Sequence, residues 1–255
     1  MRVSAQAFYA PKAGNKDSEY EDAFCPQRPL ISRKASSFSF AVADGATETS
    51  FSGMWAKQLV RAFCKGEFDV DEISRNVDTL REHWLRNVSR KPMPWYAQEK
   101  IRSGAFAALV GLGLIDSPES EEDGTWKAHA IGDSCVFQIR DSRLIAKFPI
   151  QSSNQFTNSP LLLSSIATEV SSPLQSLSTM CDSWKKGDTF YLMTDAIACW
   201  FLTETENGRV PARELQNLSS GKSGHFQPWL NGLRDSKVVR NDDVTILRVE
   251  IENSE

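Results

Sequence analysis

Short apolar runs separated by polar turns dominate the chain, and they predict many short strands. The clearest runs cover residues 3–10, 38–43, 106–115, 126–131, 136–139, 144–148, 189–194 and 243–251. Another strand is expected to begin near Asp22. Residues 126–131 and 136–139 flank a Gly-Asp-Ser turn, so we expect these two strands to pair with each other. The acidic, turn-rich residues 116–124 predict a hairpin loop.

Apolar residues recur at helical spacing in residues 53–65 and 73–90, which predicts two amphipathic helices. The second ends at Lys91-Pro-Met-Pro, because proline removes a backbone donor and fixes its own φ angle. Further helices are expected from about Tyr96, over residues 196–202 and, as short pieces, within residues 204–237. Residues 151–179 are rich in Ser, Thr, Asn and Pro and predict a long surface excursion. Together these elements favour an α+β fold, with sheets packed on each other and covered by helices.

The composition favours one globular domain over residues 1–255, with 40% apolar residues. A net charge of -4 gives no basic footprint for nucleic acid, and no apolar stretch reaches the ~20 residues that cross a bilayer. The first ten residues lack the apolar segment of a secretory signal. The cysteines are scattered and odd in number, which suits a reducing compartment, and no electropositive setting for a reactive one is visible. We therefore expect a cytoplasmic protein that binds neither nucleic acid nor membranes.

Aspartates stand where several of the predicted strands meet turns: Asp22, Asp44, Asp133, Asp195 and Asp242. A carboxylate at the edge of a core is costly unless something neutralises it, so these acids suggest one shared cation site. Histidine is scarce and never spaced as a ligand pair, and carboxylates favour Mg²⁺ or Mn²⁺ over Zn²⁺. The alternative is that each aspartate merely begins a turn.

The order and context of these acids are informative together. The segments are Glu-Asp-Ala-Phe (21–24), Val-Ala-Asp-Gly (42–45), Ser-Gly-Ala-Phe-Ala-Ala (103–108), Ile-Gly-Asp-Ser (131–134), Leu-Met-Thr-Asp-Ala (192–196) and Asn-Asp-Asp-Val-Thr (241–245). Over nearly the whole chain, this order resembles the metal-dependent protein phosphatases of the PP2C (PPM) family, in a compact bacterial form. The resemblance implies a β-sandwich of two antiparallel sheets flanked by helices, with a binuclear Mn²⁺ or Mg²⁺ centre at one end.

The resemblance also implies roles for individual residues. Asp44 would bridge the two ions, and the Gly45 carbonyl would bind one of them. Asp195 and Asp242 would complete the coordination of the other ion. The catalytic residues would then be Asp44, Asp195 and Asp242. The remaining acids would act at greater distance: Glu21 and Asp22 through metal-held waters, and Asp133 with Asp195 at a possible third ion.

The implied reaction is hydrolysis of phosphoserine and phosphothreonine in proteins, by a hydroxide that bridges the metals. The implied partners are a phosphorylated protein substrate and a cognate Ser/Thr kinase. Two alternatives stay open. One is a weakly active or inactive PP2C-like module kept for binding in signalling, and the other is a hydrolase of small phosphorylated molecules.

Two departures from the family pattern, and one long segment, bear on the substrate. The family usually has a phosphate-gripping arginine five positions before the acid matched by Asp22, where this chain has Asp17. Lys16, Lys12 or an arginine from elsewhere in the chain would have to replace it. Ala46 stands where many eukaryotic members have a histidine that acts as a general acid. Residues 151–179 would be either the flap that the family places beside the metals or a passive loop.

Overall fold

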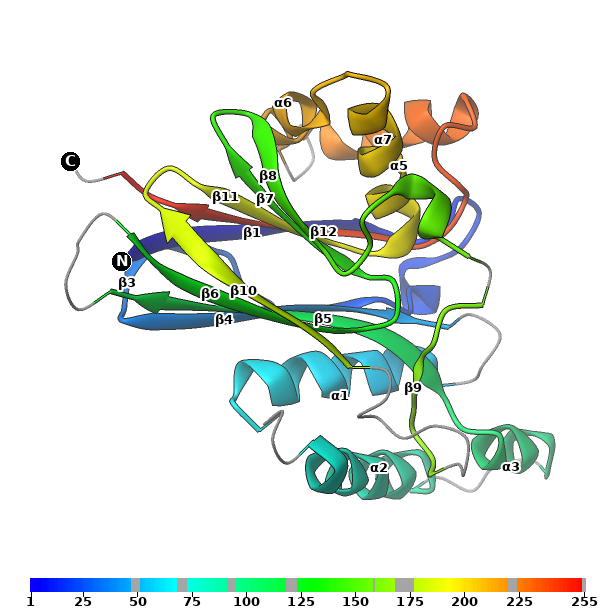
Figure 1. The fold of residues 1–255 in the computed structure, drawn as a ribbon. Coiled ribbons are helices and arrows are strands. Elements are labelled where there is room, and N and C mark those ends of the chain that lie inside the picture. Colours follow the sequence, from blue (N-terminus) through cyan, green and yellow to red (C-terminus); the bar gives the residue numbers. More distant parts are fainter. Residues whose placement is uncertain are drawn as a thin grey trace.

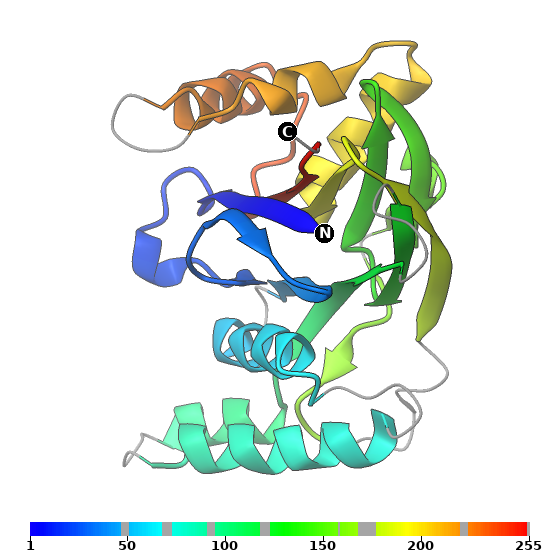
Figure 2. The ribbon, with the colours of Figure 1, turned by 90° about the vertical axis from the view of Figure 1, so that its left-hand side faces the viewer.

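Two antiparallel sheets face each other, and helices cover both outer faces (Figures 1 and 2). The computed structural model describes residues 1–46, 51–67, 73–90, 95–117, 123–157, 159–167, 177–219 and 224–253. The core between the sheets holds large apolar side chains such as Phe40, Trp126 and Phe190. The predicted α+β sandwich is confirmed.

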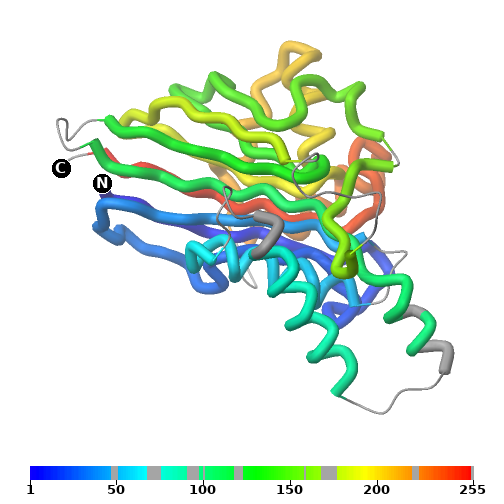
Figure 3. The backbone as a smooth tube through the Cα atoms, turned by 60° about the horizontal axis from the view of Figure 1, so that its bottom comes forward, coloured from blue at the N-terminus to red at the C-terminus, as the bar shows by residue number. Residues whose placement is uncertain are grey.

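The first sheet has the order β3-β1-β12-β11-β7-β8. Its strands are β3 (Leu30–Lys34), β1 (Arg2–Ala10), β12 (Val244–Ile251), β11 (Thr189–Met193), β7 (Cys135–Arg140) and β8 (Arg143–Phe148). Near the two ends of the chain, β1 and β12 pair residue by residue, from Val3 opposite Ile251 to Ala10 opposite Val244 (Figure 3). This pairing brings the segment after β1 beside the segment before β12.

The second sheet has the order β10-β6-β5-β4-β2, and β9 pairs with β5 beside it. Its strands are β10 (Ser178–Lys185), β6 (Asp123–Ile131), β5 (Phe106–Asp116), β4 (Ser37–Gly45), β2 (Ala23–Cys25) and β9 (Leu163–Ser164). Strand β5 is a nearly unbroken apolar run because both of its faces are covered. Val110 faces the other sheet, whereas the adjacent Leu109 faces the helices.

Helices cover the second sheet on one side of the molecule and the first sheet on the other (Figure 2). The helices on the second sheet are α1 (Ser52–Cys64), α2 (Ile73–Val88) and α3 (Trp95–Arg102). Those on the first sheet are α5 (Asp195–Glu206), α6 (Pro211–Gln216) and α7 (Phe226–Asp235). Helix α1 packs closely because Gly111 of β5 has no side chain, and a Cβ there would lie 2.3 Å from the Phe63 ring. The predicted helices are therefore confirmed, with shifts of one or a few residues at their ends.

The predicted pairing of residues 126–131 with residues 136–139 is wrong. Strand β6 pairs with β5 and β10, whereas β7 pairs with β11 and β8 in the other sheet. The turn between β6 and β7 crosses from one sheet to the other. Gly132 has a φ of 94° and packs so tightly on Ala108 that a Cβ would come within 2.6 Å of its Cβ. Asp133 consequently lies at the end of the sandwich, between the sheets.

Two edge strands, β3 and β10, were not predicted from the sequence pattern. Strand β10 is mostly exposed and lacks regular apolar alternation, but its Trp184 is buried and its indole Nε1 donates to the Ile115 carbonyl at 3.1 Å. Its first residues fall within the predicted excursion of residues 151–179. That excursion contains the small structured pieces η2 (Ser153–Gln155) and β9, while residues 158 and 168–176 lie outside the described residues.

Candidate active site

The turns that carry the predicted acids meet at one end of the sandwich, opposite the end where both termini lie (Figure 1). Asp44 lies near the end of β4, and Asp195 begins α5 directly after β11. The others lie in connections: Asp22 before β2, Asp133 between β6 and β7, and Asp242 before β12. The topology thus gathers acids that are far apart in the sequence.

These acids lie close enough to one another to raise one another's pKa values. Burial raises the pKa of Asp44 well above its usual value, and the charges of Asp22, Asp195, Asp133 and Asp242 raise it further. Burial also raises the pKa of Asp22, with the charges of neighbouring acids adding to the effect. The pKa of Asp133 rises to about 7, again chiefly through burial and then through Asp195.

The site carries more acids than bases. In the part of the chain that the structure describes, seven carboxyl groups act on one another: Glu21, Asp22, Asp44, Asp133, Asp195, Asp242 and Asp243. Three basic side chains act on them: Lys12, Arg234 and Arg240. With every group ionised, the negative charges of these groups would outnumber the positive charges by four, which would favour bound cations. The buried Oδ1 of Asp22 also lacks a hydrogen-bond partner, so the donor set fits hard divalent ions.

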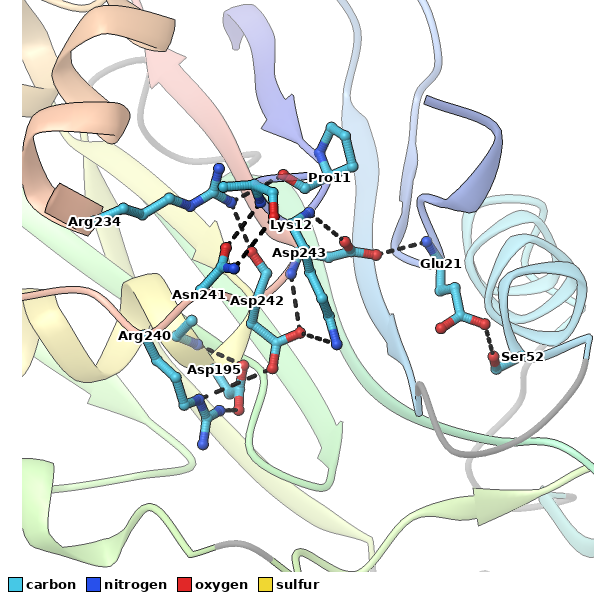
Figure 4. A network of polar contacts seen from close by, with 12 residues as sticks. Pro11, Lys12, Glu21, Ser52, Asp195, Arg234, Arg240, Asn241, Asp242 and Asp243 are labelled. Atoms are coloured by element: carbon cyan, nitrogen blue, oxygen red, sulfur yellow. Dashed lines mark hydrogen bonds and ion pairs between the residues drawn. The ribbon is translucent and has the colours of Figure 1, made fainter. Parts of the chain in front are cut away.

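The acids are gathered, but the described residues hold no preformed cage of three or more acidic, histidine or cysteine ligands. Asp195 and Asp242 face basic side chains instead (Figure 4). Arg240 donates from Nη2 to Asp195 Oδ2, and the Lys12 ammonium lies 3.1 Å from Asp242 Oδ1. These ion pairs are the nearest available compensation for clustered negative charge.

The two acids predicted to act through water are each held by a hydroxyl group. Glu21 accepts a hydrogen bond from the Ser52 hydroxyl at 2.6 Å, at the start of α1. Asp22 is fully buried, and its Oδ2 accepts from the Thr245 hydroxyl of β12 at 2.7 Å. Thr245 also contacts the Tyr20 hydroxyl. These contacts tie the segment before β2 to both α1 and β12.

Asp243 is a structural residue of the site that the sequence reasoning missed. Its buried carboxylate accepts the backbone N–H of Lys12 at 2.9 Å and that of Glu21 at 2.7 Å (Figure 4). Asn241 bonds the Ala13 backbone in a similar way, at 2.8 Å. Asp242, between them, faces Lys12 and Arg240. The available signal was the run Asn-Asp-Asp before a strand, where neighbouring side chains take opposite sides.

The lysine predicted as a phosphate ligand lies at the edge of this arrangement. Lys16 is exposed at the start of η1 (Asp17–Glu19), and its backbone N–H donates to Glu19 Oε2 at 2.8 Å. Among the described residues, Lys12 and Arg240 form ion pairs with the carboxylates of the predicted ligands Asp242 and Asp195. The role of Lys16 stays a prediction.

The glycine after Asp44 is needed for close backbone packing. A Cβ on Gly45 would come within 2.6 Å of the Glu21 carbonyl oxygen and 3.0 Å of the Ser52 backbone. We expect Gly45→Ala to lower the free energy of unfolding by about 1–3 kcal/mol, because backbone must shift. Urea unfolding measures this. Gly113→Ala in β5 is the matched control, because its Cβ would meet nothing closer than 3.7 Å, and equal stability of the two variants would contradict the expectation.

The raised pKa values predict how stability depends on pH. A carboxyl group with a raised pKa in the folded protein stabilises the fold while protonated, and this stabilisation is lost as the pH rises from about 4 through the folded value. For Asp133 that value is about 7. In EDTA, the Tm of the wild type is therefore expected to fall more than that of Asp133→Asn between pH 5 and pH 8. Thermal unfolding at both pH values measures it, and an equal fall would contradict the expectation.

Solved structures share this fold. The serine/threonine phosphatase PstP/Ppp of Mycobacterium tuberculosis has 14% identity and a TM-score of 0.57, with 99% of this chain and 100% of that chain covered. PppA of Pseudomonas aeruginosa, a regulatory component of T6SS, has 15% identity and a TM-score of 0.56, with 98% of each chain covered. The PstP catalytic domain in complex with two manganese ions has 15% identity and a TM-score of 0.54, with 99% of each covered. No protein-family profile and no curated protein sequence matches.

Proposed function

We propose that this chain, which has the PP2C-type phosphatase fold, is a metal-dependent protein serine/threonine phosphatase. The observation that carries the proposal is the excess of carboxyl groups, several of them buried, at the end of the sandwich, where acids from five separate segments of the chain meet. This excess would be costly without cations. One solved structure of the same fold is a protein phosphatase with two manganese ions.

The residues that would hold Mn²⁺ or Mg²⁺ are those that the resemblance to the family implies, and the charge distribution supports Asp44 among them. Asp44 is central, because the charges of four other aspartates raise its pKa. Asp195, Asp242 and the Gly45 carbonyl would supply further oxygens. Glu21 and Asp22 would act through waters, and Asp133 would help hold a third ion. Divalent ions held there supply Lewis acidity and neutralise charge during the attack of water on phosphorus.

The rest of the chain holds these carboxylates in place. Asp243 and Thr245 fix the segment that carries Glu21 and Asp22 against the start of β12, and Ser52 fixes Glu21 against α1. The proposed substrate is a phosphorylated protein, and the proposed partner is the Ser/Thr kinase that supplies it, in the cytoplasm. Among the described residues, no helix is both long and apolar enough to span a membrane.

The ion pairs of Asp195 and Asp242 favour a second candidate. A PP2C-like binding module without activity would keep these acids compensated by Arg240 and Lys12 in place of metal. Such a module would retain the fold and its surface but would not turn over a phosphomonoester.

Activity profiling tests the proposal. The full chain with Mn²⁺ is incubated with phosphoserine, phosphothreonine and phosphotyrosine peptides and with small phosphorylated metabolites. Release of phosphate from phosphoserine and phosphothreonine peptides, abolished by EDTA, is the expected result. Faster hydrolysis of the metabolites would identify a small-molecule hydrolase instead. Calorimetric Mn²⁺ binding without turnover of any substrate would identify the binding module.

A further inference from the structure

Arg240 connects two of the proposed metal ligands. It precedes β12, and its guanidinium donates to Asp195 Oδ2 and lies 3.9 Å, at Nε, from Asp242 Oδ2 (Figure 4). Its side chain is 51% exposed, whereas that of Asp195 is 14% exposed. The guanidinium therefore lies at the edge of the acid cluster, between the Asp195 and Asp242 carboxylates and solvent.

Both carboxylate oxygens of Asp195 already accept hydrogen bonds, so a metal ion could bind there only by displacing one of these donors. The Oδ1 of Asp195 accepts the backbone N–H of Ala196, and its Oδ2 accepts from Arg240. Asp242 is similarly engaged, because its Oδ1 accepts from the Asp243 N–H at 2.9 Å and lies 3.1 Å from the Lys12 ammonium. A divalent ion at Asp195 would compete with the guanidinium for the same oxygen.

The backbone next to Arg240 is anchored, so that an exchange requires movement of the side chain alone. Asn241 bonds Ala13, and Arg234 donates to the carbonyl oxygens of Pro11 at 3.0 Å and Asp242 at 2.7 Å. The Arg234 guanidinium therefore already donates hydrogen bonds to two backbone carbonyls. The guanidinium of Arg240 is half-exposed and, among the described residues, contacts side chains only, so that it can exchange its partners.

We propose that Arg240 is the phosphate-binding arginine of this site and that divalent metal releases it for this role. Without metal, it is the counter-ion of Asp195 and Asp242. When metal takes these carboxylates, the freed guanidinium stays within reach of any phosphate that binds the metal. Its planar fork of donors matches two phosphate oxygens. The substrate part of this inference rests on the proposed function.

Titration calorimetry with Mn²⁺ alone tests the first part of the proposal, that metal displaces Arg240 from Asp195 and Asp242. We expect Arg240→Ala to bind Mn²⁺ about fivefold more tightly than the wild type, because a competing, partly exposed ion pair is removed. The matched control is Arg209→Ala, which removes an exposed arginine paired with Glu204 near the other end of α5 and changes the net charge equally. Arg209→Ala is expected to leave Mn²⁺ affinity unchanged. Equal affinities of the wild type and Arg240→Ala, or no binding by any variant, would overturn the exchange.

Titration of inorganic phosphate into the Mn²⁺-loaded protein tests the second part of the proposal, that Arg240 binds phosphate. Arg240→Ala and Arg240→Lys are both expected to bind phosphate about tenfold more weakly than the wild type, since lysine keeps the charge but loses the fork. Arg240→Lys separates this contact from a general effect of charge. Phosphate binding that is unaffected in both variants would overturn the role of Arg240.

Neither titration measures turnover. Failure of the proposed role of Arg240 can therefore be distinguished from failure of the proposed phosphatase activity. A protein that binds Mn²⁺ and phosphate as expected but hydrolyses no phosphopeptide would refute the proposed phosphatase activity and leave the exchange of Arg240 standing. Active hydrolysis with unchanged binding in Arg240→Ala would refute the exchange alone.

Discussion

Asp44→Asn is expected to reduce Mn²⁺-dependent hydrolysis of p-nitrophenyl phosphate by about a thousandfold or more, because a carboxylate that would bridge the proposed ions is lost. Steady-state release of p-nitrophenol, with and without excess EDTA, measures the effect. Asp195→Asn is expected to be inactive as well. Full activity of either variant, or of the wild type in excess EDTA, would contradict the proposed mechanism.

The same substitution should not harm the fold. The pKa of Asp44 is raised by burial and by four neighbouring acids, so that its ionised form is costly in the metal-free protein. In EDTA at pH 8, Asp44→Asn is therefore expected to have a Tm at or above that of the wild type. Asp182→Asn, on the exposed strand β10, is the control, with unchanged activity and Tm. Loss of activity together with a lower Tm would point to misfolding rather than to a lost metal ligand.

Asp243→Ala is expected to produce the largest loss of stability. Removal of its carboxylate leaves the N–H groups of Lys12 and Glu21 without their acceptor in a partly buried place. We expect the free energy of unfolding to fall by about 2–4 kcal/mol. Urea unfolding measures the fall, and hydrolysis should fall with it because Glu21 is no longer held.

Two variants sharpen the test of Asp243. Asp243→Asn retains one acceptor oxygen and is expected to lose less stability than Asp243→Ala. Asp235→Ala, at the exposed end of α7, is the matched control and should change stability by less than about 0.5 kcal/mol. A comparably small effect of Asp243→Ala would show that the two hydrogen bonds do not hold the site together.

Much of the fold could be predicted because local patterns determine it. The apolar runs of β1, β4, β5, β11 and β12 mark core strands, and the helical spacing of α1 and α2 marks the layer that covers them. The convergence of the aspartates could also be anticipated, since carboxylates beside apolar strands are costly unless they share a cation. These features depend on residues that are close in the sequence.

The remaining features depend on contacts between distant residues. Whether β6 pairs with β7 is decided by the other strands available to each, and the edge strand β10 has too little burial to show a pattern. Arg240 and Asp243 acquire their roles only through Asp195 and the segment after β1. Likewise, the pKa of Cys25 is lowered chiefly by a hydrogen bond with Cys64, against the opposing effect of burial and with a smaller contribution from the charge of Arg61, and these neighbours are distant in the sequence.

The residue-by-residue pairing of β1 with β12 has a consequence for folding. These strands lie at opposite ends of the described chain, so their pairing closes a very large loop. Contacts between such distant segments slow folding, and the anchoring of Lys12 and Glu21 by Asp243 depends on this pairing. During synthesis, residues 242–251 follow every other acid of the cluster. The cluster should therefore be completed only late, and a growing chain lacks the complete set of acids until those residues have emerged from the ribosome.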